Sequence, residues 1–90
     1  MAMAMRHVKG RRFKALYDAL PAAIRALADK NFALLKQDPK HPSLHFKRVK
    51  DNLWSARVGK HYRALALEGA DRFQWFWIGP HAEYDRIISM

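Results

Sequence analysis

The sequence predicts an α+β domain, in which an N-terminal helical hairpin packs on a four-stranded, mostly antiparallel sheet and a short C-terminal helix or turn follows. In the first half of the chain, apolar residues recur at helical spacing. In the second half, short runs rich in aromatic and aliphatic residues are separated by turn residues. The 90 residues contain neither an internal repeat nor a linker, which predicts one domain over residues 1–90, with residues 1–5 disordered.

The helical hairpin is predicted from two amphipathic segments separated by a proline. The apolar residues of the first segment follow i, i+3, i+4, i+7 spacing: Phe13, Leu16, Tyr17 and Leu20. Proline suits the first turn of a helix, so one helix ends near Ala19 and the next begins at Pro21. Asp38-Pro39 ends the second helix, because the residue before a proline avoids helical angles. Asn31 lies in the apolar stripe of this helix, and we interpret it as hydrogen-bonded to a loop or helix rather than as a ligand contact.

The four strands are predicted where apolar runs are bounded by turn chemistry. The runs span residues 44–50, 53–58, 62–68 and 72–78, and the turns lie at residues 51–52, 59–60 and 69–71. Connections this short favour antiparallel neighbours, so the strands are expected to form a meander. An additional N-terminal strand near residues 6–8 is left open, and residues 81–88 are expected to form the short terminal helix or turn.

Side-chain alternation along each strand predicts which residues share a face of the sheet. The second run has Trp54, Ala56 and Val58 on one face, and Ser55 and Arg57 on the other. The third run has a shared face of Arg63, Leu65 and Leu67. The fourth has Phe73, Trp75 and Trp77 on one face, and Gln74, Phe76 and Ile78 on the other. Because this run is apolar on both faces, it is expected to be central or covered by another element.

Composition limits the classes of function. The formal net charge of +9 and the sequence pI near 10.4 favour a polyanionic or acidic partner. The chain has no cysteine, which fits a reducing, cytoplasmic location, and no apolar stretch long enough for a membrane span. No cofactor is expected. A zinc site built from His45, His61 and His81 is not favoured, because no ligand spacing supports it.

Cationic residues on three successive strands form the first candidate site. They are Lys47, Arg48 and Lys50, then Arg57 and Lys60, then Arg63. Neighbouring strands lie about 4.8 Å apart, so such a group can match successive phosphates. A solvated charged face is the alternative, and it is favoured for Lys50 and Lys60 at the turns. For Arg57 and Arg63, inside strands and flanked by apolar residues, a specific role stays open.

The second candidate site follows the last strand, after the Gly79-Pro80 break. His81 could act as a general acid or base, because histidine titrates near neutrality. Tyr84 could stack on a base or orient a phosphate. The alternative is a histidine that caps the helix and a tyrosine that packs in the core.

The order of these motifs resembles the RelE/ParE superfamily of type II toxins. The motifs are Pro-Ser-Leu-His-Phe-Lys at 42–47, Trp-Ser-Ala-Arg-Val-Gly at 54–59, His-Tyr-Arg-Ala-Leu at 61–65 and Trp-Ile-Gly-Pro-His-Ala-Glu-Tyr-Asp at 77–85. The resemblance covers residues 11–88. It implies a toxin held inactive by a cognate antitoxin. RelE-like members cut mRNA in the ribosomal A site, whereas ParE-like members poison DNA gyrase.

The resemblance also implies roles for individual residues. Arg63 matches the strand arginine that cutting members place on the phosphate, and Arg57 matches one of their basic strand residues. His81 matches a position that carries arginine or histidine, and Tyr84 lies near a C-terminal aromatic residue. Ser55 departs from the pattern, because RelE has a basic residue there. We consider Lys47 as a substitute for it.

These observations lead to one leading hypothesis and two alternatives. The leading hypothesis is a ribosome-dependent mRNA endoribonuclease with a catalytic site of His81, Arg63, Arg57 and Tyr84, and with Lys47, Arg48 and Lys60 binding RNA. The alternatives are a non-enzymatic gyrase inhibitor and a basic binding module without toxicity. The expected partners are mRNA, the ribosome and an antitoxin, which would lie over the sheet as an extended or helical segment in a hetero-oligomer.

Overall fold

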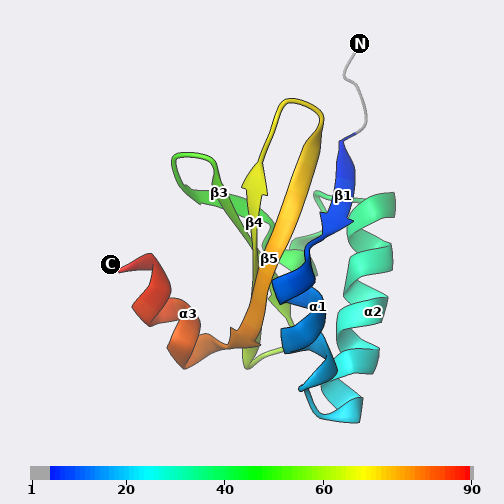
Figure 1. The fold of residues 1–90 in the computed structure, drawn as a ribbon. Coiled ribbons are helices and arrows are strands. Elements are labelled where there is room, and N and C mark those ends of the chain that lie inside the picture. Colours follow the sequence, from blue (N-terminus) through cyan, green and yellow to red (C-terminus); the bar gives the residue numbers. More distant parts are fainter. Residues whose placement is uncertain (1–4, 90) are drawn as a thin grey trace.

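The computed structural model describes residues 5–89 (Figure 1). Its elements are β1 (Arg6–Lys9), α1 (Arg11–Asp18), α2 (Ala22–Gln37), the 3₁₀ turn η1 (Pro42–Leu44), β2 (Lys47–Lys50), β3 (Leu53–Val58), β4 (Tyr62–Glu68), β5 (Arg72–Pro80) and α3 (His81–Ile88). The predicted helical hairpin and terminal helix are confirmed. The predicted disorder of residues 1–5 falls, except for residue 5, outside the described residues.

The sheet has five strands in the order β1-β5-β4-β3-β2. The expected count of four is therefore wrong, because β1 forms the additional strand and pairs in parallel with β5, with Arg6 opposite Arg72 and Lys9 opposite Trp75. The remaining pairs are antiparallel. The sequence of β1 is short and contains two cations among its four residues, so by itself it hardly predicts a strand. It forms a strand because β5 offers its backbone an edge with which to pair.

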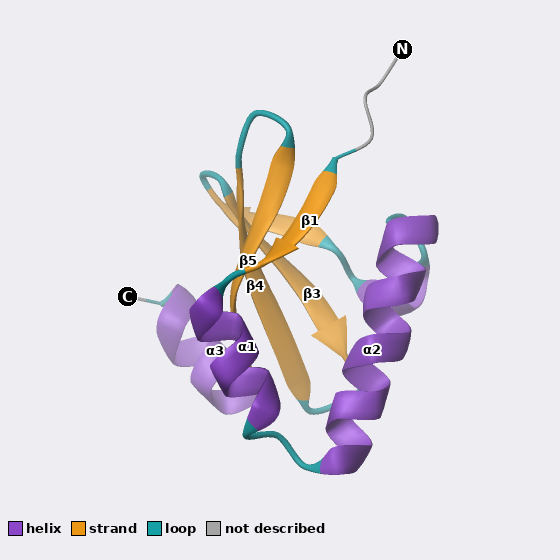
Figure 2. Ribbon diagram, turned by 45° about the vertical axis from the view of Figure 1, so that its right-hand side comes forward, coloured by secondary structure: helices purple, strands orange, loops and turns teal. Residues whose placement is uncertain are grey.

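Helices cover both faces of the sheet. The α1–α2 hairpin packs on one face, and α3 lies on the other (Figures 1 and 2). A large core fills the hairpin side, and a smaller cluster around Leu65, Trp77 and Tyr84 fills the α3 side. No helix within residues 5–89 has both the length and the apolar character needed to cross a bilayer.

A β-bulge at Phe76 interrupts the alternation of β5. Trp77 pairs with Leu65, but Trp75 pairs with Ala66, the next residue of β4. Two residues of β4 therefore oppose three of β5, and Phe76 is the extra residue. A bulge of this kind moves every later side chain to the other face.

The bulge corrects the predicted faces of β5. Phe73 and Trp75 lie in the core beneath the hairpin as predicted, but Trp77 lies on the α3 side. Ile78 is correspondingly on the hairpin side rather than opposite Trp75. Strict alternation fails here because five of the seven residues in the run are apolar, so nothing in the sequence marks the register change.

The main core is built around Trp75, which is 1% exposed. Its indole Nε1–H donates to Nδ1 of His7 at 3.1 Å. The imidazole of His7 stacks on Phe73 with ring centroids 5.5 Å apart, and Phe32 and Phe46 approach it edge-on. Burial lowers the pKa of His7 below its usual 6.5, and the nearby Lys36 ammonium lowers it further.

The lowered pKa of the half-buried His7 imidazole predicts that the domain loses stability in mild acid. The folded pKa of His7 lies below the unfolded value of 6.5, so the unfolded state binds more protons as the pH falls. The free energy of unfolding should be fully retained above about pH 6.5 and should decrease below it. Chemical denaturation across this range measures the effect. A His7→Phe variant should show a weaker dependence, and an equal pH slope in both proteins would contradict the assignment to His7.

Candidate functional site

Strand pairing places four polar side chains on the sheet face that carries α3. Arg57 of β3 lies directly opposite Arg63 of β4, and Ser55 lies opposite Leu65, which packs near α3. Lys47 of β2 lies opposite Ser55 across the β2–β3 pair. Directly opposite residues of paired strands project to the same face. Three of the six grouped strand cations, Lys47, Arg57 and Arg63, therefore share this face with the buried Ser55.

Arg63 is held at the centre of this face by two neighbours. Its guanidinium carbon lies 5.1 Å from the ring centroid of Tyr84, and Nη1 donates to the Ser55 hydroxyl at 3.4 Å. Its Nε is buried and has no hydrogen-bond partner within the described part of the chain. An unpaired buried donor costs about 1–3 kcal/mol, so this arrangement is unfavourable until an acceptor arrives. A guanidinium fixed in this way is suited to binding an anion such as phosphate.

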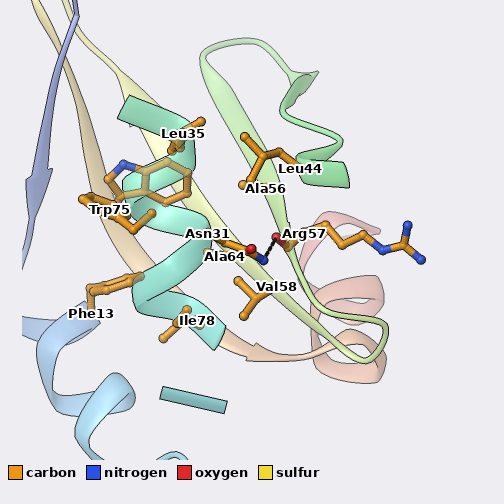
Figure 3. A pocket seen from close by; sticks show the side chains of 12 residues that line it. Phe13, Asn31, Leu35, Leu44, Ala56, Arg57, Val58, Ala64, Trp75 and Ile78 are labelled. Carbon is orange, nitrogen blue, oxygen red and sulfur yellow. Dashed lines mark hydrogen bonds between the residues drawn. The ribbon is translucent and has the colours of Figure 1, made fainter. Parts of the chain in front are cut away.

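Arg57 adds a second cation opposite the first. Asn31 of α2 donates to its backbone carbonyl at 3.2 Å, which fixes this part of β3. Figure 3 shows this bond, and it shows the Arg57 side chain extending away from the apolar core cavity. Nη1 lies 3.4 Å from Nε2 of His45. Within residues 5–89, no carboxylate forms an ion pair with Arg57 or Arg63.

The two guanidinium groups of Arg57 and Arg63 are expected to repel each other and to lower the free energy of unfolding. Like charges at directly opposite positions destabilise a sheet by roughly 0.2–1 kcal/mol. Arg57→Gln should therefore raise the free energy of unfolding by about that amount, and the gain should shrink at high salt. Thermal denaturation at two salt concentrations measures it. Arg72→Gln, which removes a half-exposed arginine that pairs with Asp71, is the control and should give no gain.

His81 enters this face as the first residue of α3. The break predicted at Gly79-Pro80 is wrong, because both residues pair with β4 and β5 runs directly into α3. The backbone N–H of His81 donates to the carbonyl of His61 at 2.8 Å. Nδ1 lies 3.1 Å from a carboxylate oxygen of Asp85, one helical turn later. The imidazole ring lies 5.5 Å from the ring of Tyr84. Tyr84 thus contacts both Arg63 and His81, and its 5% exposure makes it a support for both side chains rather than a free stacking platform.

The three predicted RNA-binding residues lie in different places. Lys47 shares the face of Arg63. Arg48 lies opposite Trp54, so it projects to the hairpin side and not toward Arg63. Lys60 is exposed in the turn between β3 and β4, beside a groove against α2. The structure therefore brings Arg57, Arg63, His81 and Tyr84 together with Lys47, but not with Arg48.

Comparison with known proteins identifies the family. A family profile described as "ParE-like toxin domain" matches residues 22–86, which is most of the chain. The chain belongs to the ParE-like toxin family. The resemblance to RelE/ParE toxins is thereby confirmed as membership of the ParE-like toxin family. No curated protein matches the sequence.

Solved structures share the fold of this toxin at low identity. The RelB–RelE antitoxin–toxin complex of Methanococcus jannaschii matches with a TM-score of 0.69 and 18% identity, over 88% of this chain and 96% of that one. A mutant of the E. coli toxin RelE in the free state matches with a TM-score of 0.66 and 16% identity, over 97% and 93%. The YoeB/ParE toxin of Agrobacterium tumefaciens matches with a TM-score of 0.65 and 15% identity, over 86% and 99%.

Three residues of the toxin's site were not predicted in their observed roles. Ser55 was noted only as a departure from the family pattern, yet its hydroxyl accepts from Arg63. Asp85 contacts His81 across one helical turn, and this i, i+4 spacing is readable from the sequence. His45 reaches Arg57 from a left-handed backbone conformation, which no local pattern indicates. No three His, Asp or Glu side chains of residues 5–89 are grouped so that they could hold a metal ion.

Proposed function

We propose that this toxin is an endoribonuclease that cuts ribosome-bound mRNA and thereby blocks translation. One observation carries the proposal: Tyr84 and Ser55 fix Arg63 opposite a second arginine, and its buried Nε has no hydrogen-bond partner among residues 5–89. Such a site favours a group that gains negative charge, as the phosphate does during RNA cleavage. The histidine beside Tyr84 adds a group able to move a proton.

In the proposed reaction, the ribose 2′-oxygen attacks the adjacent phosphorus. A bond from the 2′-oxygen to phosphorus forms, and the bond from phosphorus to the 5′-oxygen breaks. Arg63 and Arg57 donate to the non-bridging oxygens, where charge accumulates in the transition state. The products are a 2′,3′-cyclic phosphate and a 5′-hydroxyl.

His81 is the proposed proton acceptor. The contact between Nδ1 and Asp85 favours a tautomer whose Nε2 is free to take the proton of the 2′-hydroxyl. Water supplies the proton of the leaving 5′-oxygen. Asp85 orients the imidazole in this scheme, as a carboxylate does for a catalytic histidine in general.

Lys47 is proposed to supply the cation that the strand lacks at Ser55. It is the neighbour of Ser55 across the β2–β3 pair and projects to the same face. It is exposed, so its ammonium can reach a phosphate without loss of packing. We assign Lys47 to binding of the RNA backbone beside the scissile phosphate.

We also propose that the toxin acts in the cytoplasm and is held inactive by a cognate antitoxin in a hetero-oligomer. RelE of Pyrococcus horikoshii and RelE of Methanococcus jannaschii were crystallised with RelB. The strongly basic chain favours an acidic partner segment, extended or helical, laid over the sheet. Such a segment would cover Arg57 and Arg63 and so block the RNA.

Inhibition of DNA gyrase is the second candidate function. The family profile is described as ParE-like, and serine at position 55 removes a cation from the cutting face. This function predicts double-strand breaks without mapped RNA cuts. It leaves the unpaired donor of Arg63 and the placement of His81 without a role, which is why we favour the nuclease.

The deciding experiment induces the toxin in cells without antitoxin and maps RNA 5′ ends. We expect cuts inside translated frames that vanish in a His81→Ala variant of equal abundance. Growth arrest with a DNA-damage response and no such cuts would assign the toxin to gyrase. Absence of any arrest would leave a binding module without toxicity.

A further inference from the structure

A basic groove runs along the open edge of β3, outside the face that carries Arg63. Strand β2 pairs with β3 only as far as Ser55, so residues 56–58 of β3 face η1 and α2 instead. The groove has a volume of about 540 Å³, which lies within the roughly 300–1,000 Å³ of ligand clefts. Its lining comes from three segments: Leu27, Lys30, Asn31 and Leu34 of α2; His41 and Ser43 beside η1; and Arg57, Gly59 and Lys60 at the end of β3.

The groove has the charge and shape of a phosphate path. Lys30, Arg57 and Lys60 bring cations from two walls. Its described lining residues include no carboxylate and no Phe, Tyr or Trp ring. Strand-binding sites that grip bases use aromatic rings, whereas cations spread along a groove follow the backbone. The lining therefore favours the sugar–phosphate backbone over the bases, with the two leucines against ribose carbons.

Local structure holds the walls in place. Gly59 has a φ of +66°, and a Cβ at this position would lie 2.5 Å from Leu27, so the turn approaches α2 as closely as only glycine permits. Asn31 ties α2 to the carbonyl of Arg57. Nδ1 of His41 accepts from the backbone N–H of Ser43 at 3.3 Å and lies 2.8 Å from its hydroxyl. With Nδ1 occupied, the neutral imidazole carries its proton on Nε2, which adds a donor to this wall.

We propose that this groove binds the backbone of the RNA strand that flanks the cleaved phosphate, independently of its sequence. The inference rests on the proposed nuclease function and extends it. Arg57 joins the two regions, because it lies opposite Arg63 on the catalytic face and also lines the groove. An RNA strand whose cleaved phosphate lies at Arg63 therefore continues around the edge of β3 toward Lys60 and Lys30. An acidic peptide is the competing occupant.

The test compares two double variants of the full chain. Lys30→Gln/Lys60→Gln changes the groove, and Lys14→Gln/Lys40→Gln removes two lysines elsewhere. All four lysines are exposed, so both variants should fold, and each lowers the formal charge by two, from +9 to +7. The probe is a 2′-O-methyl oligouridylate, which cannot be cut because it lacks the attacking hydroxyl. Its affinity is measured over a salt series.

We expect the groove variant to lose about 25-fold in affinity near 0.1 M salt, and its log–log salt slope to shrink by about 1.4, since each phosphate contact on a single strand contributes about 0.7. The matched variant should stay close to the unsubstituted toxin. Equal losses in both variants, or no loss in either, would overturn the proposal. The proposal would also be overturned if the groove variant still bound the RNA probe but no longer bound a polyglutamate peptide. That result would assign the groove to an acidic protein.

A failed nuclease proposal gives a different result. In that case no variant cuts RNA, while the groove variant still loses the uncleavable probe. Conversely, loss of RNA cleavage in an Arg63→Gln variant whose affinity for the uncleavable probe keeps the same dependence on salt would separate the catalytic site from the groove.

Discussion

Replacing Arg63 by glutamine is expected to lower the rate of RNA cleavage by about 10²–10³-fold, the usual cost of removing a donor that stabilises charge in a transition state. The guanidinium is already oriented by Ser55 and Tyr84, so the free toxin spends no further energy to position it. Single-turnover cleavage of mRNA in ribosome complexes measures the effect. The loss should appear in the chemical step, because phosphate charge increases there.

The same substitution should not destabilise the fold. Arg63 faces Arg57, and its buried Nε has no partner in the part of the chain that the structure describes. Glutamine therefore removes both an electrostatic repulsion and this unsatisfied donor. A large fall in the midpoint of thermal unfolding would therefore show that lost activity reflects misfolding. Arg63→Lys tests geometry, because it keeps the charge but not the planar fork, and it should recover only part of the rate. The control is Arg72→Gln on β5, which should cleave normally.

The fold could be predicted from the sequence where patterns are local. Helical spacing and prolines indicated the hairpin, and turn residues marked the four later strands. The first of these strands begins at Lys47 and not at Leu44, because residues 42–44 form the 3₁₀ turn η1. Strand β1 was weakly signalled, because its stability comes from pairing with β5, which lies far away in the sequence. The bulge at Phe76 was hidden, because every candidate position around it is apolar and either register buries a tryptophan.

The site could be predicted only for residues whose position follows from strand alternation. Arg57 and Arg63 were grouped as cations of successive strands, and strand pairing places them directly opposite each other. Arg48 was grouped with them because it is close in the sequence to Lys47, yet neighbouring residues of a strand project to opposite faces. The contacts of Arg63 with Tyr84, and of Arg57 with His45, join segments whose approach depends on the assembled sheet. No spacing rule gives such contacts in advance.

Replacing His81 by glutamine is expected to slow cleavage by about 10²–10⁴-fold, the usual contribution of a general acid or base. The loss should appear in the chemical step, which single-turnover cleavage measures. Asp85→Asn should give a smaller loss than His81→Gln, because Asp85 acts through the imidazole and not on the RNA. Glu83→Gln changes another carboxylate of α3; it is the matched control and should leave the rate unchanged. A His81→Gln variant with normal rates would reduce His81 to a helix cap and leave proton transfer to another group on the face of Arg63.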